Sequence, residues 1–417
     1  MTGFLDRERA AALMDRAGLD ALVLCEPESF QYAAGAAMGP AGLFRRAGAG
    51  FAVVPRDTRL PLGVVIADFN AASLRAASPS ALVLTHPIWI ETARLEQARS
   101  NMSLGQRIEA GLASFGRASD FTRPATFDLA HSVRQLNTLL AQFGLERGRL
   151  GLDLDFVPAT DLATLQALMP GRLLVNGSPV FEKLRAVKSE KEIELLGRGI
   201  VFSEAGMTRL QDGAAPGMRQ SDLIALYREG VTKAAQGSLG QVSTAEYLTI
   251  GAYPKAADGR TEAGDPVKAD MICTVDGYAS DMSRNFVLGT PSADQLELHA
   301  IAERAFEAGL ALLTPGKSLA DVHRAATRCL EQDGIRSYRR GHFGHGVGHS
   351  VFSEQWPFIS ADSAVEIEAD MVLAFEIPLY VEGLASFNLE DQFLITQGGP
   401  VSMNRLPRKL GVMQRQD

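Results

Sequence analysis

The sequence predicts an α/β protein of two domains, the second of which combines antiparallel strands with helices (α+β). A chain of 417 residues is too long for one ordinary hydrophobic core. In the first half, short apolar runs alternate with stretches of helical periodicity. In the second half, an Asp-Gly turn joins two strand-like runs, and two further runs lie near the end. We expect a first domain over 1–170, a linker over 171–182 and a second domain over 183–417.

The first domain opens with apolar residues at helical spacing over residues 4–17. A buried strand is expected next, at Ala21–Cys25. Apolar runs predict further strands at Phe51–Val54, Leu62–Ile66, Ala81–Leu84 and Gly151–Asp153, and helical spacing predicts helices at Ala130–Phe143 and Leu162–Leu168. The glycines and prolines of Pro170–Val180 favour a linker there.

The second domain begins with a helix over Ser189–Gln211, because Ser189 with Glu192 three residues later forms a capping box. Pro216-Gly217 follows this helix, and Pro315-Gly316, 99 residues further on (315 − 216), follows another. An internal duplication explains the repeat and predicts a pseudo-two-fold domain. Two unrelated helices that both end in Pro-Gly explain it about as well.

Composition excludes several classes of protein. The net charge of −8, from 41 basic and 49 acidic residues, argues against nucleic acid as the main partner. Three cysteines without a CxxC pair indicate a reducing compartment rather than a disulfide framework. The amino-terminal segment has no apolar signal region, and no apolar stretch of about 18 residues predicts a membrane helix. We therefore expect a cytoplasmic protein.

Two aspartates flank the Asp276-Gly277 turn. The turn pairs Ile272 with Asp281 across the hairpin, so Asp270 is the diagonal neighbour of Asp281 on the same face. Aspartate is disfavoured in strands, and two such carboxylates repel unless a cation lies between them. An exposed acidic face is the alternative, and it is favoured if these two residues are taken alone.

One histidine and two glutamates extend this set. His345 lies among glycines, beside His342 and His349, and its apolar neighbours predict a buried strand. Glu376 and Glu390 interrupt apolar, strand-like runs. A buried glutamate needs a partner or becomes protonated, and metal coordination supplies one. Four carboxylates and an imidazole suit two ions of Mn, Fe, Co or Zn that activate water for hydrolysis.

These motifs resemble the pita-bread metallopeptidases, which include prolidase, aminopeptidase P and methionine aminopeptidase, with creatinase as a metal-free relative. The ligand types occur in the family's order, at spacings of 11, 64, 31 and 14 residues from Asp270 through Asp281, His345 and Glu376 to Glu390. The opening, from Arg7-Glu8-Arg9 to Pro27-Glu28-Ser29, resembles the creatinase-type N-terminal domain. Leu184–Ser189 resembles the entry into the catalytic domain, and Arg284 completes the hairpin motif. The resemblance covers essentially the whole chain.

The resemblance implies a role for each residue of the set. Asp270 would hold one ion, Asp281 and Glu390 would bridge two ions, and His345 and Glu376 would hold the second. A bridging water or hydroxide would be the nucleophile, and Glu376 would accept and pass on its proton. A homodimer is also implied.

Three positions depart from the family pattern. Phe352 and Tyr253 stand where prolidase-type enzymes have substrate-binding histidines, and Asn388 stands where an arginine is common. The family's Glu-Pro-Gly is Glu376-Ile377-Pro378 here. His349 or the hydroxyl of Tyr253 would take over a lost role, or His349 merely packs against its neighbours.

Three functions follow as hypotheses. The first is a metal-dependent hydrolase of short peptides, like Xaa-Pro dipeptidase or aminopeptidase P. The second is an enzyme acting on a non-peptide small molecule, such as ectoine-ring hydrolysis, creatinase-like C–N cleavage or dimethylsulfoniopropionate C–S cleavage. For it, Tyr253, Phe352 and Trp356 would hold a cation by cation–π contact, unless they simply fill core. The third is a non-catalytic binding protein, against which the complete ligand set argues.

Overall fold

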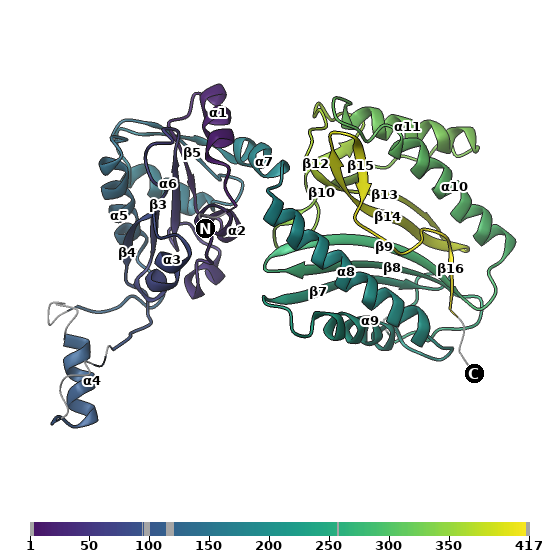
Figure 1. Ribbon diagram of the computed structural model, residues 1–417, viewed down its shortest axis with the longest axis horizontal. Helices are drawn as coiled ribbons and strands as arrows, with labels where there is room; N and C mark the ends of the chain where they lie inside the picture. Colours follow the sequence, from purple (N-terminus) through teal and green to yellow (C-terminus); the bar gives the residue numbers. More distant parts are fainter. Residues whose placement is uncertain (1–3, 94, 96–100, 114–120, 257, 414–417) are drawn as a thin grey trace. The chain divides into compact units, whose positions relative to one another are not determined.

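Figure 1 shows the computed structural model of the chain, described here for residues 4–93, 95, 101–113, 121–256 and 258–413. The chain forms two compact units, Met1–Leu184 and Arg185–Asp417. The stretch 171–182, expected as a linker, is instead regular structure. Leu173 and its neighbours pair in parallel with a strand that begins at Arg149, and a helix starts at Ser178. The apolar residues between the glycines are enough to form this edge strand.

The first unit contains a six-stranded mixed sheet in the order β4-β3-β2-β1-β5-β6. Its strands lie where the apolar runs predict them, with the addition of β6. They are β1 (Ala21–Leu24), β2 (Phe51–Pro55), β3 (Gly63–Ala67), β4 (Leu82–His86), β5 (Arg149–Leu152) and β6 (Leu173–Asn176).

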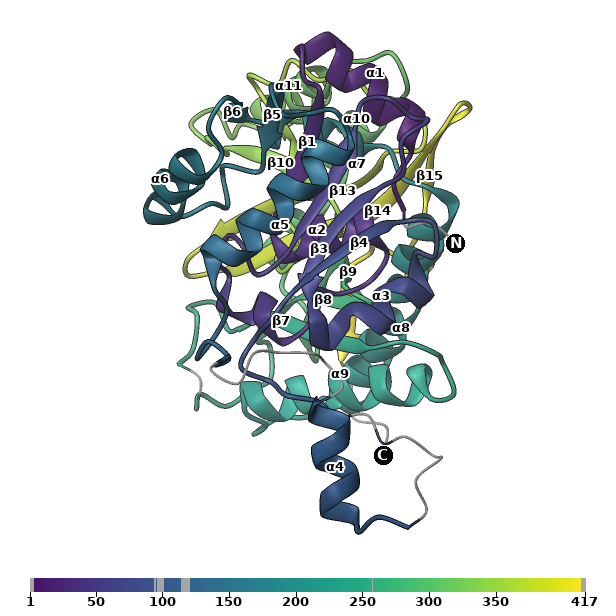
Figure 2. The same cartoon turned by 90° about the vertical axis from the view of Figure 1, so that its left-hand side faces the viewer.

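Helices cover both faces of this sheet (Figure 2). Leu22 and Leu24 pack with the α1–α3 side, whereas Ala21 and Val23 pack with α5 and α6, because successive side chains of a strand point to opposite faces. The helices are α1 (Arg7–Ala17), α2 (Pro27–Ala34), α3 (Ala71–Ala77), α4 (Leu104–Ala113), α5 (Leu129–Gln142), α6 (Ala159–Leu168) and α7 (Ser178–Ala186), with 3₁₀ turns η1 (Pro40–Phe44) and η2 (Asp68–Asn70).

The second unit is built on one large sheet. Its main path runs β12-β10-β13-β14-β9-β8-β7, while β11 and β16 pair with β9, and β15 pairs with β14. The strands are β7 (Val242–Ile250), β8 (Pro266–Val275), β9 (Tyr278–Leu288), β10 (His342–Gly346), β11 (Gly348–His349), β12 (Gln355–Ser360), β13 (Val372–Val381), β14 (Ala385–Thr396), β15 (Gly399–Ser402) and β16 (Gly411–Met413).

Two helix pairs repeat within this unit and give it the predicted pseudo-two-fold character. They are α8 (Glu190–Gly213) with α9 (Gln220–Ala235), and α10 (Ala293–Leu310) with α11 (Leu319–Gln332). The capping box of Ser189 and Glu192 is present at the start of α8. Between the helices of each pair, Gly217 and Gly316 have φ angles of 86° and 80°, a left-handed conformation that glycine adopts without strain. No helix within the described residues combines the length and apolar character needed to cross a membrane.

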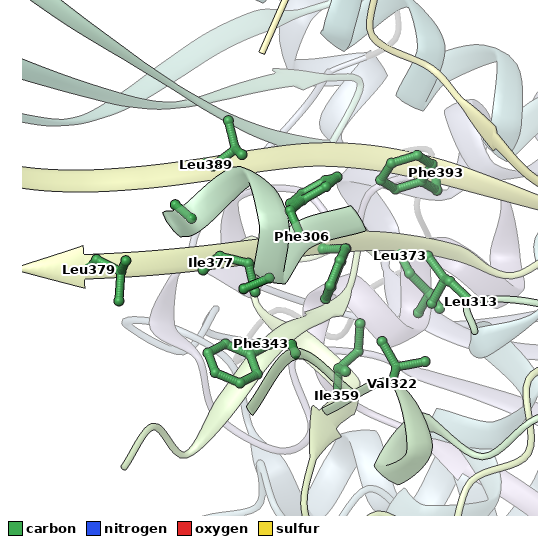
Figure 3. Packing of buried hydrophobic residues seen from close by; sticks show 14 of the residues in the cluster. Phe306, Leu313, Val322, Phe343, Ile359, Leu373, Ile377, Leu379, Leu389 and Phe393 are labelled. Atoms are coloured by element: carbon green, nitrogen blue, oxygen red, sulfur yellow. The ribbon is translucent and has the colours of Figure 1, made fainter. Parts of the chain in front are cut away.

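One large hydrophobic cluster of the second unit packs the sheet against α10 and α11 (Figure 3). Phe375, Ile377 and Leu379 of β13 are buried on the helix side, where the ring of Phe306 lies 4.7 Å from that of Phe375. Because side chains alternate along a strand, Glu376 points to the opposite face of the sheet. That face carries the polar residues singled out in the sequence.

Candidate metal centre

The strand register gathers the predicted residues on one face of the sheet. Asp270 of β8 pairs with Ser283 of β9, Ser283 pairs with Glu390 of β14, and Glu390 pairs with Glu376 of β13. The four residues therefore form one row across four neighbouring strands. Residues far apart in the chain are neighbours because β9 pairs with β14 in the same sheet.

Asp281 and His345 belong to the next row. Asp281 pairs with Ile272, as the turn predicts, and lies two residues from Ser283, so the two side chains share a face. His345 pairs with Ala374, which is two residues from Glu376. The residues flanking His345 are the glycines of β10, and the backbone of β13 lies within 2.1 Å of where a Cβ of Gly344 would be. Glycine is required there for the two strands to pair.

Three of the predicted ligands converge. One donor atom each from Asp281, His345 and Glu390 lies within 4.8 Å of the others, and all three residues are buried. His345 Nε2 is 3.9 Å from both Asp281 Oδ2 and Glu390 Oε1. Asp281 Oδ1 is buried and has no hydrogen-bond partner within the described residues. A buried carboxylate oxygen without a partner is costly unless a cation or a water meets it.

The protonation states of this group suit a cation. Burial lowers the pKa of His345 to about 4, so its ring is neutral at ordinary pH. Its Nδ1 lies 3.1 Å from the carbonyl of Gly346 and therefore carries the hydrogen, which leaves the Nε2 lone pair toward the carboxylates. Burial, and then the neighbouring carboxylates, raise the pKa values of Asp281 and Glu390 well above the ordinary range. A divalent ion would remove this repulsion, and the donor set fits one.

Asp270 and Glu376 have other partners. Lys268 Nζ donates to Asp270 Oδ2 at 3.0 Å, and Arg340 Nη2 donates to Glu376 Oε1 at 3.0 Å. The amide of Asn388 reaches both carboxylates, at 3.4 Å to Asp270 and 3.0 Å to Glu376. The predicted five residues thus share one face, but within the described residues only three of them form a convergent group of ligand atoms.

A buried ion pair lies next to the candidate centre and connects two of its strands. Arg284 Nη2 donates to Asp391 Oδ1 at 2.7 Å, and both side chains are almost fully buried. Arg284 Nη1 donates to the backbone carbonyls of Ser283 and Glu390. These hydrogen bonds tie β9 to β14 at the positions that carry the metal-binding row.

The predicted substrate-handling residues lie in different surroundings. Asn388 is buried within the site. His349 is buried against the ring of Tyr278, with ring centroids 5.2 Å apart, and burial lowers its pKa to about 3. Neither of its ring nitrogens has a hydrogen-bond partner in the part of the chain that is described. Tyr253 and Phe352 are 64% and 45% exposed.

This arrangement corrects two expectations. Val351 and Phe352, which the apolar pattern placed with His345 on a buried strand, follow the end of β11 in exposed positions. Trp356 packs against the core of the second unit, whereas Tyr253 is largely exposed. The three aromatics therefore do not form the predicted cation-binding pocket, because Tyr253 and Phe352 lie in turns whose side chains face solvent.

Two basic residues near the centre, Lys268 and Arg340, were missed in the sequence, and His342 was named only as a neighbour of His345. Lys268 had a usable signal, because it precedes Asp270 by two residues in a strand and must share its face. Arg340 had none, since it lies in an irregular segment whose path is set by tertiary contacts. His342 stood out only through its proximity to His345; its Nδ1 is 3.6 Å from Glu376 Oε1.

Comparison with known proteins agrees with this geometry. Residues 7–187 match the creatinase/prolidase N-terminal domain, and residues 194–397 match metallopeptidase family M24. The chain belongs to this family of metallopeptidases, with an N-terminal domain of the creatinase/prolidase type. Its catalytic unit has the pita-bread fold, and the family resemblance seen in the sequence is confirmed.

Several proteins similar to this chain are named as peptidases. A probable dipeptidase PepE of Mycobacterium tuberculosis is 28% identical over 62% of this chain and 69% of its own length. A Xaa-Pro dipeptidase of Pyrococcus furiosus is 25% identical over 55% of this chain and 66% of its own length. The crystal structure of an X-Pro aminopeptidase from Thermotoga maritima superposes with a TM-score of 0.71 at 18% identity, over 98% of this chain and 99% of that one.

Proposed function

We propose that the protein is a metal-dependent hydrolase of short peptides of the Xaa-Pro type, with its divalent ion held by Asp281, His345 and Glu390. The observation that carries the proposal is the convergence of these three buried donors around a neutral imidazole nitrogen. Carboxylate-rich sites with one imidazole suit Mn, Fe, Co or Zn, and manganese is our first choice. We expect a cytoplasmic homodimer.

The ion would polarise the scissile carbonyl and lower the pKa of a bound water. The chain's own residues would transfer the proton and hold the carboxylates of the site in position. Burial raises the pKa of Glu376, while Arg340 opposes this rise, which leaves a carboxylate suited to accept and return a proton. Asn388 and Arg340 hold the two oxygens of Glu376 in place, and Asn388 also orients Asp270.

The charge of the site argues against the proposed alternative of a sulfonium or quaternary ammonium substrate. Lys268 and Arg340 are both cationic and both reach the carboxylates of the site. A substrate cation would have to compete with them for the same oxygens.

Turnover of Xaa-Pro substrates tests the proposal. Protein freed of metal by chelation should be inactive on Ala-Pro and on Ala-Pro-Ala, and addition of Mn²⁺, Co²⁺, Zn²⁺ or Fe²⁺ should restore hydrolysis. Asp281→Asn should abolish the restored activity, whereas Asp294→Asn, at the exposed first turn of α10, should leave it intact. Glu376→Gln should lower kcat by roughly 10²- to 10⁴-fold.

Two results would contradict the proposal. Bound metal without turnover of any Xaa-Pro substrate would favour an enzyme of a non-peptide molecule. Protein that binds no metal would favour a non-catalytic role for the fold.

A further inference from the structure

Glu354 is an acidic residue beside the candidate metal centre, separate from the predicted ligands. It lies between β11 and β12, and its side chain is 35% exposed. The preceding residue, Ser353, is buried and hydrogen-bonds through its side chain to Asp281. Glu354 itself interacts electrostatically with Asp281 and His345. Its carboxylate is therefore held next to the centre and remains partly open to solvent.

The contacts of Glu354 leave room for a further cation. Its Oε2 lies 3.4 Å from His342 Nε2, and the other ring nitrogen of His342 lies 3.6 Å from Glu376 Oε1. Arg340 interacts with Glu354 electrostatically, but its ion pair is with Glu376. Among the described residues, no lysine or arginine forms an ion pair with Glu354. A partly exposed carboxylate without a fixed counter-charge attracts a cation.

An aromatic ring lies near this carboxylate on the metal-binding face of the sheet. Phe358 of β12 pairs with His345 of β10, so the two side chains share a face. Phe358 is 36% exposed, and its ring centroid lies 5.3 Å from that of His342. His342 therefore has the Glu354 carboxylate and an exposed aromatic ring as neighbours. Together these two groups attract an ammonium group, by hydrogen bonds and by cation–π contact.

We propose that Glu354, His342 and Phe358 form an amine subsite, which binds the free amino terminus of the substrate. The Glu354 carboxylate accepts hydrogen bonds from the ammonium group, and the ring of Phe358 packs against it. This deepens the proposed function and rests on it for the peptide nature of the substrate. It narrows the substrates to short peptides whose first residue has an unmodified α-amino group.

The amine subsite is distinct from the carboxylates that carry basic partners. Lys268 pairs with Asp270 and Arg340 pairs with Glu376, so a substrate amino group at Glu354 does not compete with either of them. An amino group also offers N–H donors to a carboxylate, which a sulfonium or quaternary ammonium group lacks. The subsite therefore selects an amino terminus over these other cations.

Substrate selectivity tests the amine subsite. Ala-Pro and propionyl-proline differ only in the amino group, and kcat/KM is measured for both with Mn²⁺-loaded, full-length protein. The wild type should prefer Ala-Pro by about 10- to 100-fold, the effect of a hydrogen bond to a charged group. In Glu354→Gln this preference should disappear through a higher KM for Ala-Pro, whereas propionyl-proline should be hydrolysed as by the wild type. An unchanged preference, or an equal loss for both compounds, would overturn the proposal.

Two variants serve as controls. Glu354→Asp keeps the charge and should retain part of the preference for Ala-Pro. Asp362→Asn is the matched removal of a carboxylate, because Asp362 follows the other end of β12 and hydrogen-bonds to Ser360. It should show the preference of the wild type, and a loss there as large as in Glu354→Gln would contradict the proposal.

Phe358→Leu keeps the proposal testable if Glu354→Gln does not fold. Leucine is apolar but has no aromatic face, so the preference for Ala-Pro should fall by about two- to fivefold. An unchanged preference in this variant would contradict the subsite.

Manganese content distinguishes a substrate-binding residue from a metal ligand. Glu354→Gln should retain as much Mn²⁺ as the wild type after dialysis, as counted by mass spectrometry. A loss of bound Mn²⁺ in this variant would make Glu354 a metal ligand and would overturn the proposal.

A binding measurement separates this inference from the proposed function. If the wild type hydrolyses neither compound, the peptidase function is contradicted, and both compounds are then titrated into the Mn²⁺-loaded protein in a calorimeter. Tighter binding of Ala-Pro that is lost in Glu354→Gln would support the amine subsite alone. Equal binding of the two compounds by the wild type would contradict the subsite as well.

Discussion

At the scale of single residues, the centre depends on buried charges that neutralise one another. Asp281 and Glu390 are candidate ligands of a cation. Asp270 forms an ion pair with Lys268, and Glu376 forms one with Arg340. Asp391 forms an ion pair with Arg284. Removing one member of such a pair leaves the other charge buried without a partner. The cost of that exceeds the benefit that the pair itself contributes.

Asp391→Asn tests this for the buried Arg284–Asp391 pair beside the centre. The amide keeps the shape of the side chain but leaves Arg284 without its counter-charge, so the free energy of unfolding should fall by about 3 to 5 kcal/mol. Urea denaturation of the second unit measures it. Asp321→Asn, which breaks the exposed pair with Arg324, should cost no more than about 1 kcal/mol. Equal losses in the two variants would show that Arg284 does not depend on Asp391.

Single residues also show which parts of the site the sequence could and could not predict. The five ligand types were recognised because charged residues in apolar strands need partners. Lys268 and Arg340 were not recognised, since a basic residue close to an acidic one in the sequence usually forms an exposed ion pair with it. Only the register showed that Lys268 Nζ and Asp270 Oδ2 meet inside the centre.

At the scale of elements, alternation along the strands separates the core from the site. Phe375, Ile377 and Leu379 of β13 lie in the core with α10, and Glu376 faces the candidate centre. The Asp276-Gly277 turn sets the register of β8 and β9, which is why the pairing of Ile272 with Asp281 could be predicted. The linker could not, because a short edge strand such as β6 has the same composition as a loop.

Helix α10 carries a buried histidine that should make this unit sensitive to acid. Burial, then the charge of Arg284, lower the pKa of His299 to about 4, so the unfolded chain takes up its proton at a higher pH than the folded one. Its stabilising contribution is complete above about pH 6.5 and is lost as the pH falls toward 4.

His299→Leu removes this dependence. Between pH 7 and pH 5 the wild type should lose about 2 kcal/mol more unfolding free energy than the variant. Urea denaturation of both proteins at the two pH values measures the difference. A constant difference between wild type and variant would mean that His299 titrates alike in the folded and unfolded chain.

At the scale of the whole molecule, the two units have separate hydrophobic cores, and every residue of the candidate centre lies in the second. Length and alternation predicted two domains, the family resemblance predicted their types, and the two compact units meet in the chain at 184/185. Metal bound at the proposed centre would therefore stabilise one unit directly. Ligand that binds only the folded state raises its stability according to its concentration and affinity.

Calorimetry should show this division. With Mn²⁺ at about 100 times its Kd, the second unit gains about 2.7 kcal/mol, which corresponds to a rise in Tm of roughly 5–10 °C. The transition of the first unit should not move. A single transition that shifts as a whole would contradict the independence of the two units.

The most direct test of the central claim is the position of the metal in crystals of the Mn²⁺-loaded protein, located by anomalous scattering. The account predicts a strong peak in contact with Asp281, His345 and Glu390. No peak at these three residues, or a single peak away from His345, would contradict it.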